Sequence, residues 1–234
     1  MAERLEVLAI IPIRGGDPEA RHGCMLTLGQ KPILAYTIES ARASRLITRI
    51  VVSTDDADVV RVARQQGAEA PFLRPKELSS QDVSLGRVLQ HALLWLEERE
   101  GYRADLVVLL EITHPIRPPG LIDRVIEVLL AEQLDSVFVA REERHEFWYF
   151  NARGALERVQ PSEDSPRQKL PPLYKEMRGM VTVMRADLVR TAKRLGERVG
   201  LVPLRDASSL VDLHDEDGLR LAEALINQGY PDQA

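Results

Sequence analysis

Residues 8–23 read LAIIPIRGGDPEARHG. The first part is a run of apolar residues, which is typical of a buried strand. It is followed at once by Arg14, Gly15 and Gly16. Glycine lets backbone N–H groups approach an anion closely, and a guanidinium binds phosphate oxygens, so we expect a phosphate-binding loop here, with a simple turn as the alternative. The glycine spacing is neither that of a dinucleotide fingerprint nor that of a P-loop.

Apolar runs and helical periodicities alternate along the rest of the chain. We expect strands over 5–13, 50–52, 106–110, 136–140, 180–184 and 201–204, and helices over 32–46, 56–66, 85–96, 121–131 and 216–227. This alternation predicts a single α/β domain over residues 1–234, with a mostly parallel sheet and helices on both faces. Ligands bind beyond the carboxyl ends of the strands in such sheets. The loops after Ile13, Val52 and Leu110 are therefore the candidate site loops.

The alternation stops between residues 142 and 175. This stretch holds an aromatic cluster, Phe147 to Phe150, and then the proline-rich polar sequence PSEDSPRQKLPP. A disordered linker is one interpretation, but large aromatic side chains are stabilised by burial. We therefore expect an inserted arm over 142–175 that packs on a second copy of the chain and forms a homodimer.

Composition limits the possible partners. With 234 residues, of which 44% are hydrophobic, the chain can bury a full core. The net charge of −5 leaves no basic surplus for a nucleic-acid backbone, so we expect no nucleic-acid partner. Apolar runs are far shorter than the roughly 20 residues of a membrane span, and no signal-peptide pattern begins the chain. We therefore expect a cytoplasmic protein without a membrane partner.

The chain has one cysteine, Cys24. A single cysteine excludes an internal disulfide and a cysteine metal cluster. Nothing in the sequence pairs a general base with it, so a small semi-buried thiol is a better interpretation than a nucleophile.

Several segments occur in the order and at nearly the spacing of a known family. They read IPIRGG, KPILAYTIESA, IVVSTDD, GAEAPFLRPKEL, LLEITHPIR, PRQKLPP and VDLHDEDGLRLAE, within residues 8–226. Together they resemble the acylneuraminate cytidylyltransferases, which activate nine-carbon acidic sugars. The resemblance implies a nucleotidyltransferase α/β sandwich with a dimerisation arm. It also implies transfer of CMP from CTP to a 2-keto acidic sugar or a related acceptor, with release of pyrophosphate and with Mg²⁺, or alternatively Mn²⁺, as the cation.

The same resemblance implies which residues bind the nucleotide. They are Arg14, which is also a candidate catalytic residue, with Gly15, Gly16, Arg21, Arg74 and Ser84. The alternative for Arg74 is a solvated loop arginine, and the alternative for Ser84 is a helix N-cap.

The phosphate loop departs from the family. Where relatives carry a lysine and then an arginine–lysine–asparagine group, an ungapped match places Pro18, His22, Gly23 and Cys24. The loop has thus lost most of its fixed positive charge, and we expect Arg21 to replace part of it.

The acceptor residues implied by the resemblance lie in two places. Glu111, Thr113 and Arg117 follow the strand at 106–110, and Arg167, Gln168 and Lys175 lie in the arm. Cations in the arm suit a substrate carboxylate, although a solvated lysine is the alternative for Lys175.

Glu111 stands where the family has glutamine, and His114 where it has serine. A carboxylate repels an acidic substrate unless it is protonated or paired, so we expect a different sugar.

The metal motif is also altered. The family alternates two aspartates on a short strand, and here the pair is Asp212 and His214. Mg²⁺ prefers hard oxygen ligands, so Asp212 is the stronger candidate, as metal ligand and catalytic residue, and His214 is the weaker one. We expect the acidic residues at 215–217 to begin the last helix instead.

Other functions stay open at this point. A nucleotidyltransferase of the same fold could use a different nucleotide or acceptor. Residues 56–58 read DAD, the form of a glycosyltransferase metal motif, although helix capping also explains them. A non-catalytic nucleotide-binding relative with an eroded site would explain the lost lysines and His214.

Overall fold

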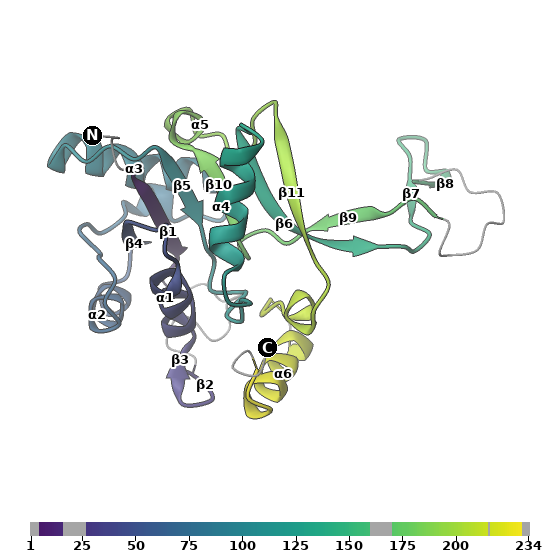
Figure 1. Cartoon of the computed structure of the whole chain (residues 1–234), viewed down its shortest axis with the longest axis horizontal. Coiled ribbons are helices and arrows are strands. Elements are labelled where there is room, and N and C mark those ends of the chain that lie inside the picture. The colour runs from purple at the N-terminus through teal and green to yellow at the C-terminus, as the bar shows by residue number, and fades with distance from the viewer. Residues whose placement is uncertain (1–4, 16–26, 160–169, 215, 231–234) are drawn as a thin grey trace.

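A mixed sheet of seven strands forms the centre of the protein (Figure 1). The computed structural model describes residues 5–15, 27–159, 170–214 and 216–230. The strand order is β11-β6-β10-β5-β1-β4, and β9 pairs with β6. The bounds are β1 Val7–Ile13, β4 Arg49–Thr54, β5 Leu106–Leu109, β6 Ser136–Glu143, β9 Leu173–Glu176, β10 Thr182–Arg185 and β11 Val199–Leu204.

The strands run mostly in one direction, as predicted. β4, β1 and β5 are mutually parallel, and β6 is parallel to β11. β10 is antiparallel to both of its neighbours, β5 and β6. After β6 the chain passes through the arm and returns along β9, which pairs with the last residues of β6. β10 therefore starts at this edge of the sheet and runs back between β5 and β6, with no helical crossover. The carboxyl ends of five strands and the start of β10 therefore meet at one edge.

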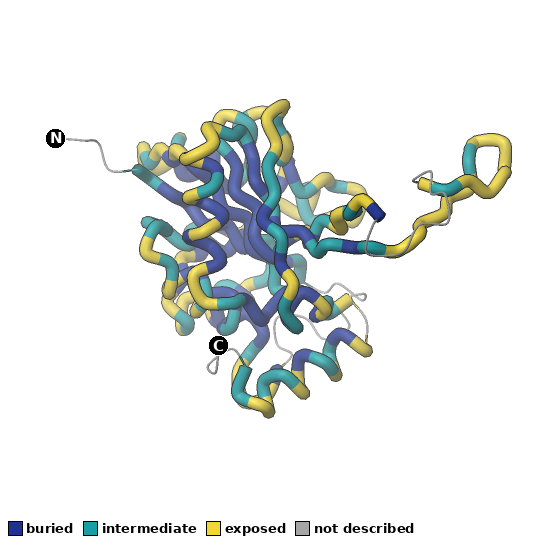
Figure 2. The backbone as a smooth tube through the Cα atoms, turned by 45° about the vertical axis from the view of Figure 1, so that its right-hand side comes forward, coloured by how far each residue is buried: buried dark blue, intermediate teal, exposed yellow. Residues whose placement is uncertain are grey.

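Helices cover both faces of the sheet, which confirms the expected layering. On one face α1 (Ile33–Ala43), α2 (Ala57–Gln65) and α4 (Leu121–Ala131) pack on the larger core cluster. On the other face α3 (Leu85–Glu100) and α5 (Ala186–Arg190) pack on a second cluster. The tube in Figure 2 is accordingly buried along the sheet. Two buried apolar layers enclosing a parallel sheet explain why strands such as β5 are apolar throughout.

The last helix, α6 (Glu216–Asn227), forms a third cluster below the carboxyl edge of the sheet. Its apolar side packs with Leu28, Ile33, Ile116 and Val211. The short elements β2 (Thr27–Leu28), β3 (Lys31–Pro32), η1 (Lys76–Leu78) and η3 (Ala207–Leu210) complete the fold. No helix in the described ranges has both the length and the hydrophobicity that a bilayer span requires.

Helix ends follow local hydrogen bonding. Asp56 is the N-cap of α2, and its side chain accepts from the N–H of Asp58 at 2.7 Å. Capping therefore explains the DAD sequence. The helix expected over 32–46 ends at Ala43, which is earlier than predicted. Ser44 is extended there, because the carboxylate of Asp123 accepts from its hydroxyl and from the following backbone N–H groups.

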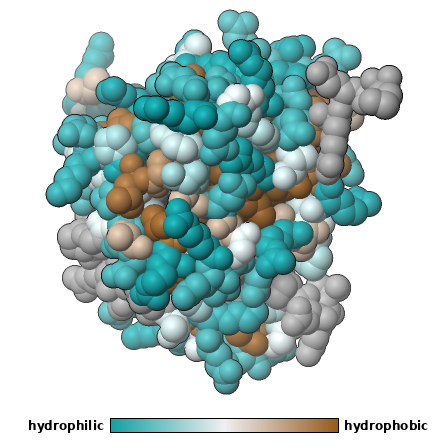
Figure 3. Space-filling model, turned by 90° about the vertical axis from the view of Figure 1, so that its left-hand side faces the viewer, coloured by the Kyte–Doolittle hydropathy of each residue, from teal (hydrophilic) through white to brown (hydrophobic). Residues whose placement is uncertain are grey.

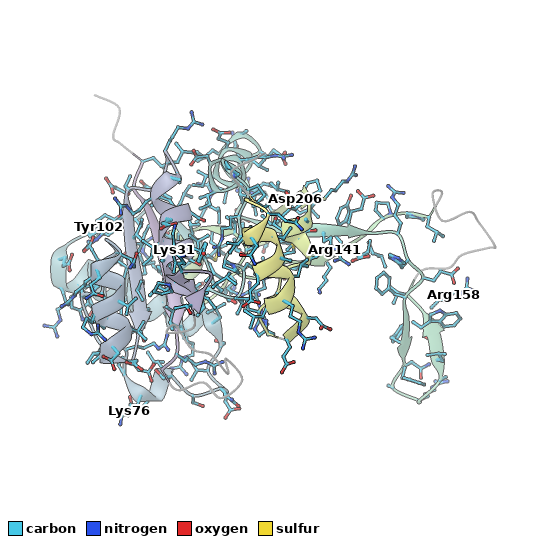
Figure 4. The ribbon with its side chains drawn as sticks, turned by 90° about the horizontal axis from the view of Figure 1, so that it is seen from below. Lys31, Lys76, Tyr102, Arg141, Arg158 and Asp206 are labelled. Atoms are coloured by element: carbon cyan, nitrogen blue, oxygen red, sulfur yellow. The ribbon has the colours of Figure 1, made fainter. Side chains whose placement is uncertain are left out.

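The arm is a hairpin of β6 and β9 that projects from the body, with β7 (Trp148–Phe150) and β8 (Leu156–Arg158) near its tip (Figure 1). Its exposed apolar residues are Phe147, Trp148, Tyr149, Phe150, Leu156, Val159 and Tyr174. Figure 4 shows Arg141 at the root of the arm and Arg158 near the tip. The opposite face of the body is mostly hydrophilic, with patches of hydrophobic residues between polar ones (Figure 3). Association of the arm with a second copy stays a prediction.

Candidate active site

The exit of β1 packs closely against the exit of β4. The N–H of Gly15 donates to Asp55 Oδ1 at 2.9 Å. A Cβ on Gly15 would lie 2.6 Å from the Cβ of Asp56, so only glycine fits without displacing that residue. Arg14 precedes this contact, whereas Gly16 and Arg21 lie outside the described residues, as does Cys24.

Arg74 is buried at the ends of the same two strands. The residue is 2% exposed, and its guanidinium donates to the carbonyl oxygens of Ile13 at 2.9 Å and Ser53 at 3.0 Å. Burial lowers its pKa, Asp55 opposes that shift, and the charge of Arg14 adds to it. The alternative of a solvated loop arginine is therefore wrong. Arg74 thus joins the exit of β1, at the residue before Arg14, to the exit of β4.

Ser84 occupies the N-cap position of α3, as its alternative interpretation expected. Its hydroxyl makes no capping hydrogen bond, and the residue is exposed. The backbone carbonyl of Ser84 accepts the first hydrogen bond of the helix, from Arg87. Its predicted contact with the nucleotide stays a prediction.

Two segments that are distant in sequence lie side by side at the carboxyl end of β5. The N–H of Leu213 donates to the carbonyl oxygen of Thr113 at 3.0 Å. Nδ1 of His114 donates to the carbonyl oxygen of Val211 at 2.8 Å. The first segment carries Glu111 and the second carries Asp212. The structure therefore brings together residues that the sequence motifs placed separately.

Glu111 is held in position from two sides. Its N–H donates to the carbonyl oxygen of Gly179 at 2.8 Å, and its own carbonyl accepts from Nη2 of Arg117 at 2.7 Å. Gly179 has a φ of +83°, and a Cβ there would lie 2.5 Å from the Cβ of Glu111. The side chain of Glu111 thus lies against a position where only glycine fits.

Burial and neighbouring charges shift the pKa of Glu111 in opposite directions. Burial raises its pKa, and the charges of four residues oppose that shift. These residues are Arg178, His214, Arg194 and Arg117. The surrounding cations explain how a carboxyl group is tolerated where an acidic acceptor was expected to bind.

Arg117 is a buried supporting residue. Its guanidinium donates to the carbonyl oxygens of Met180 at 2.6 Å and Gly179 at 3.0 Å, and to Thr37 Oγ1 at 3.1 Å. Burial lowers its pKa to about 9. This geometry favours a role in holding the loop over the predicted direct contact with a substrate.

The remaining predicted acceptor residues are scattered. Thr113 Oγ1 is buried and has no hydrogen-bond partner among the described residues. Lys175 lies on β9, exposed, opposite Arg141 of β6. Arg167 and Gln168 lie outside the described residues.

Asp212 and His214 form an ion pair on the segment before α6. Nδ1 of His214 donates to Asp212 Oδ1 at 2.5 Å. This hydrogen bond lowers the pKa of Asp212 to about 2 and raises the pKa of His214. Asp212 is therefore ionised at neutral pH, and its partner ring holds its proton more firmly than a free histidine.

The donor set fits Mg²⁺ only in part. Mg²⁺ is commonly bound by one or two carboxylates together with substrate phosphates, and Asp212 supplies one ionised carboxylate. Nδ1 of His214 is committed to that carboxylate. Within the ranges that the structure describes, no group of three or more His, Cys, Asp or Glu residues is arranged to hold a metal.

Sequence reasoning missed two features of this edge. Arg178 is exposed beside Gly179, and its charge acts on Glu111. Asp55 accepts from Gly15 and lies 3.5 Å from Arg74. A glycine that follows a charged residue just before a strand is the one signal that could have pointed to Arg178.

Known proteins are similar to this chain in sequence and in fold. A family model described as "Cytidylyltransferase" matches residues 8–223. Post-translational flagellin modification protein B of Campylobacter coli is 27% identical over 228 residues, which cover 95% of this chain and 96% of that protein. A pseudaminic acid cytidylyltransferase of Campylobacter jejuni is 33% identical over 135 residues, 58% of each chain.

Solved structures agree on the fold. A CMP:2-keto-3-deoxy-manno-octonic acid synthetase complexed with CTP aligns with a TM-score of 0.70 at 16% identity, over 96% of this chain and 99% of that one. A 4-diphosphocytidyl-2C-methyl-D-erythritol synthase from Anaerococcus prevotii gives 0.69 at 13% identity, over 96% of this chain and 100% of that one. The resemblance found in the sequence is therefore confirmed, and the chain belongs to the cytidylyltransferase family.

Proposed function

We propose that the protein transfers CMP from CTP to an acidic 2-keto sugar or a related acceptor, with release of pyrophosphate. The observation that carries this proposal is the meeting, at one sheet edge, of the Arg14–Gly15 loop, Glu111 and the segment of Asp212. Relatives named for pseudaminic acid and for N,N'-diacetyllegionaminic acid support an acidic sugar as the acceptor. Ligands bind beyond the carboxyl ends of parallel strands, which is the edge that these residues occupy.

The nucleotide would bind on the β1 and β4 side of this edge. Arg14 and the backbone of Gly15 would contact phosphate oxygens, as a guanidinium and exposed N–H groups do in general. Arg74 would act by fixing the exits of both strands, because its donors already bind Ile13 and Ser53. The exposed hydroxyl of Ser84 would be available to the base.

The acceptor would bind on the side of β5 and β10. Arg178 and Lys175 are exposed cations that suit the carboxylate of an acidic sugar. Cations here would also limit the repulsion between an acidic acceptor and Glu111.

Asp212 would hold the cation, with nucleotide phosphates completing its coordination, and His214 is the second candidate ligand through its other ring nitrogen. Bound Mg²⁺ would supply neutralisation of the phosphate charge. If His214 is a ligand, Mn²⁺ or Co²⁺ should support more activity than Mg²⁺, since imidazole suits them better. His214→Asp should then restore the preference for Mg²⁺, and an unchanged preference would exclude His214 as a ligand.

The arm at 142–175 would form a homodimer, and the reaction would take place in the cytoplasm, where CTP is available. Phe150, at the tip, is 73% exposed in the single chain. Contiguous exposed apolar residues mark interaction sites, which supports burial of this tip against a second copy.

The test is pyrophosphate release by the purified protein. CTP, ATP and GTP are each supplied with Mg²⁺ or Mn²⁺ and a panel of 2-keto acidic sugars, and Asp212→Asn serves as the control for background hydrolysis. We expect release only with CTP and an acidic sugar present together. No release under any condition, with CTP binding retained, would favour the non-catalytic relative with an eroded site.

A further inference from the structure

The connection from β9 to β10 holds two guanidinium groups at the carboxyl edge of the sheet. Arg178 lies in this connection, and Arg194 lies in the connection from α5 to β11. Nη1 of Arg194 donates to Glu176 Oε1 at 3.1 Å. Glu176 is the last residue of β9, two positions before Arg178. The two arginines are therefore held at the same place, although they come from different connections.

Packing on α3 brings the second connection to this edge. A Cβ on Gly86, in the first turn of α3, would lie 2.0 Å from the carbonyl oxygen of Ala192. Because α3 leads back to the start of β5, its first turn lies toward the carboxyl edge of the sheet. The residues that follow Ala192, with Arg194 among them, are thus fixed near the site.

The two cations lie beside Glu111, at the end of β5. The carbonyl oxygen of Gly179 accepts from the N–H of Glu111 at 2.8 Å. A Cβ on Gly179 would lie 2.6 Å from the carboxyl carbon of Glu111, so this carboxyl group packs against the residue next to Arg178. The charges of Arg178 and Arg194 both act on it. The pair therefore lies in the acceptor half of the proposed site.

Most hydrogen-bond donors of this pair are not used by the fold. The guanidinium of Arg178 is exposed and makes no hydrogen bond or ion pair with the residues that the structure describes. In the same ranges the guanidinium of Arg194 binds only Glu176, through Nη1, which leaves Nε and Nη2 for another group. A guanidinium presents its donors as a planar fork that matches both oxygens of a carboxylate.

Arg194 differs from Arg198, which lies in the same connection. Nη2 of Arg198 donates to Asp135 at 2.9 Å, just before the start of β6 and thus at the opposite edge of the sheet. The side chain of Arg198 is 59% exposed, whereas that of Arg194 is 20% exposed. A partly buried charge attracts an anion more strongly than a solvated one. Arg194 is therefore the better placed of the two to bind an acidic ligand.

We propose that Arg178 and Arg194 bind the carboxylate of the acceptor and set the preference for acidic over neutral sugars, an assignment that rests on the proposed function. Their charges offset the repulsion between Glu111 and an acidic acceptor. A neutral acceptor leaves both guanidinium groups without the anion that they are placed to bind, so the site rejects it.

The test uses pseudaminic acid and 2-keto-3-deoxy-manno-octonic acid as probes, each as the free acid and as its methyl ester. The ester keeps the sugar ring and its hydroxyl groups but has no negative charge. Pyrophosphate release gives kcat and KM, and calorimetry gives the Kd of each probe without nucleotide. We expect the wild type to bind at least one acid about tenfold or more tightly than its ester.

Arg178→Gln and Arg194→Gln each remove one guanidinium group. We expect each variant to raise the KM and the Kd for the acid by about tenfold or more, while kcat and the KM for CTP change by less than about threefold. The preference for the acid over the ester should fall in both, which a loss of packing alone would not cause. Arg198→Gln is the matched control and should behave as the wild type.

Each outcome decides the assignment. A Kd for the acid within about threefold of the wild type in either variant would overturn the pair. Equal weakening of the acid and the ester would also overturn it, because the arginines would then maintain only the shape of the site. Weaker binding of CTP in the variants would assign the pair to the nucleotide phosphates instead.

The binding measurements separate this assignment from the proposed function. A wild type that releases no pyrophosphate, yet prefers an acid to its ester through both arginines, would overturn the proposed function and leave the carboxylate site standing. A wild type that releases pyrophosphate but binds neither acid better than its ester would overturn the carboxylate site alone. Failure of both measurements would overturn both.

Discussion

Nδ1 of His114 lies 2.8 Å from the carbonyl oxygen of Val211, a residue 97 positions further along the chain. A carbonyl oxygen only accepts, so this ring nitrogen carries the proton. Burial lowers the pKa of His114, and its hydrogen bonds to the backbone of Val211 and Arg178 oppose that shift. The hydrogen bond places Asp212, the next residue, beside the loop that carries Glu111.

The His114 contact can be tested with two substitutions of similar size. His114→Leu leaves the Val211 carbonyl without a partner and should lower the free energy of unfolding by about 1–3 kcal/mol, measured by urea denaturation. Turnover should fall as well, because Asp212 is no longer held. In His114→Asn the side-chain amide can occupy the place of Nδ1 and should restore most of both quantities. Equal losses in the two variants would show that ring packing, and not the hydrogen bond, matters here.

Gly179→Ala should be more damaging than a comparable glycine substitution elsewhere. Its φ of +83° disfavours alanine, and the new Cβ would lie 2.5 Å from the Cβ of Glu111. Gly101 is the control, because its φ is +67° and a Cβ added there would meet no atom within 4 Å. Gly101→Ala should cost about 1–2 kcal/mol, whereas Gly179→Ala should cost more and also lower kcat. Equal costs and an unchanged kcat would contradict the proposed packing of Glu111.

The Asp212–His214 pair predicts a defined pH dependence of stability. The pKa of His214 is raised above 6.5, so its contribution is complete below about pH 6.5 and is lost as pH rises through the folded-state value. The pKa of Asp212 is lowered from 3.8 to about 2, so its contribution is present above about pH 4 and is lost as pH falls through 2. The stability difference between the wild type and Asp212→Asn should therefore be largest between about pH 4 and 6.5.

The same pair can be followed directly by NMR. The ring protons of His214 should titrate above pH 6.5 in the wild type and at a lower pH in Asp212→Asn, since the hydrogen-bonded carboxylate is the main cause of the shift. His214→Gln assigns the resonance. An unchanged midpoint in Asp212→Asn would mean that the pair does not form in solution.

The arm predicts a concentration-dependent assembly. Phe150→Ser should shift the protein from dimer to monomer, measured by light scattering at several concentrations, because it removes the most exposed aromatic side chain of the tip. Leu130→Ser, at the end of α4, removes an exposed apolar side chain from the body and should leave the dimer intact. A wild type that stays monomeric at high micromolar concentration would refute the dimer.

The elements were predictable from the sequence where local signals decide them. The helices expected over 121–131 and 216–227 have those bounds in the structure. The buried strands at the centre of the sheet were also predictable, because apolar runs of that length need cover on both faces. The antiparallel direction of β10 was not, since it depends on the path of the arm rather than on any pattern within residues 182–185.

The site was predictable only in its parts. The motifs identified Glu111 and Asp212 as separate candidates, but nothing in local periodicity places the segments that carry them side by side. That proximity depends on His114 reaching Val211, a contact of high sequence separation. Arg74 illustrates the same limit: its motif was visible, whereas its burial beneath the exits of β1 and β4 follows from tertiary packing.

The position of β10 between β5 and β6 affects how the chain completes its fold during synthesis. β1, β4 and β5 have all left the ribosome soon after residue 109 is made, and they can pair at once. β6 follows at 136–143 but cannot join them, because its neighbour in the sheet is residues 182–185, which are translated after the whole arm. Until then β5 presents an unpaired edge, the kind of surface on which nascent chains aggregate. A transcript truncated within the arm would therefore yield an open half-sheet, prone to capture by chaperones, rather than a smaller enzyme.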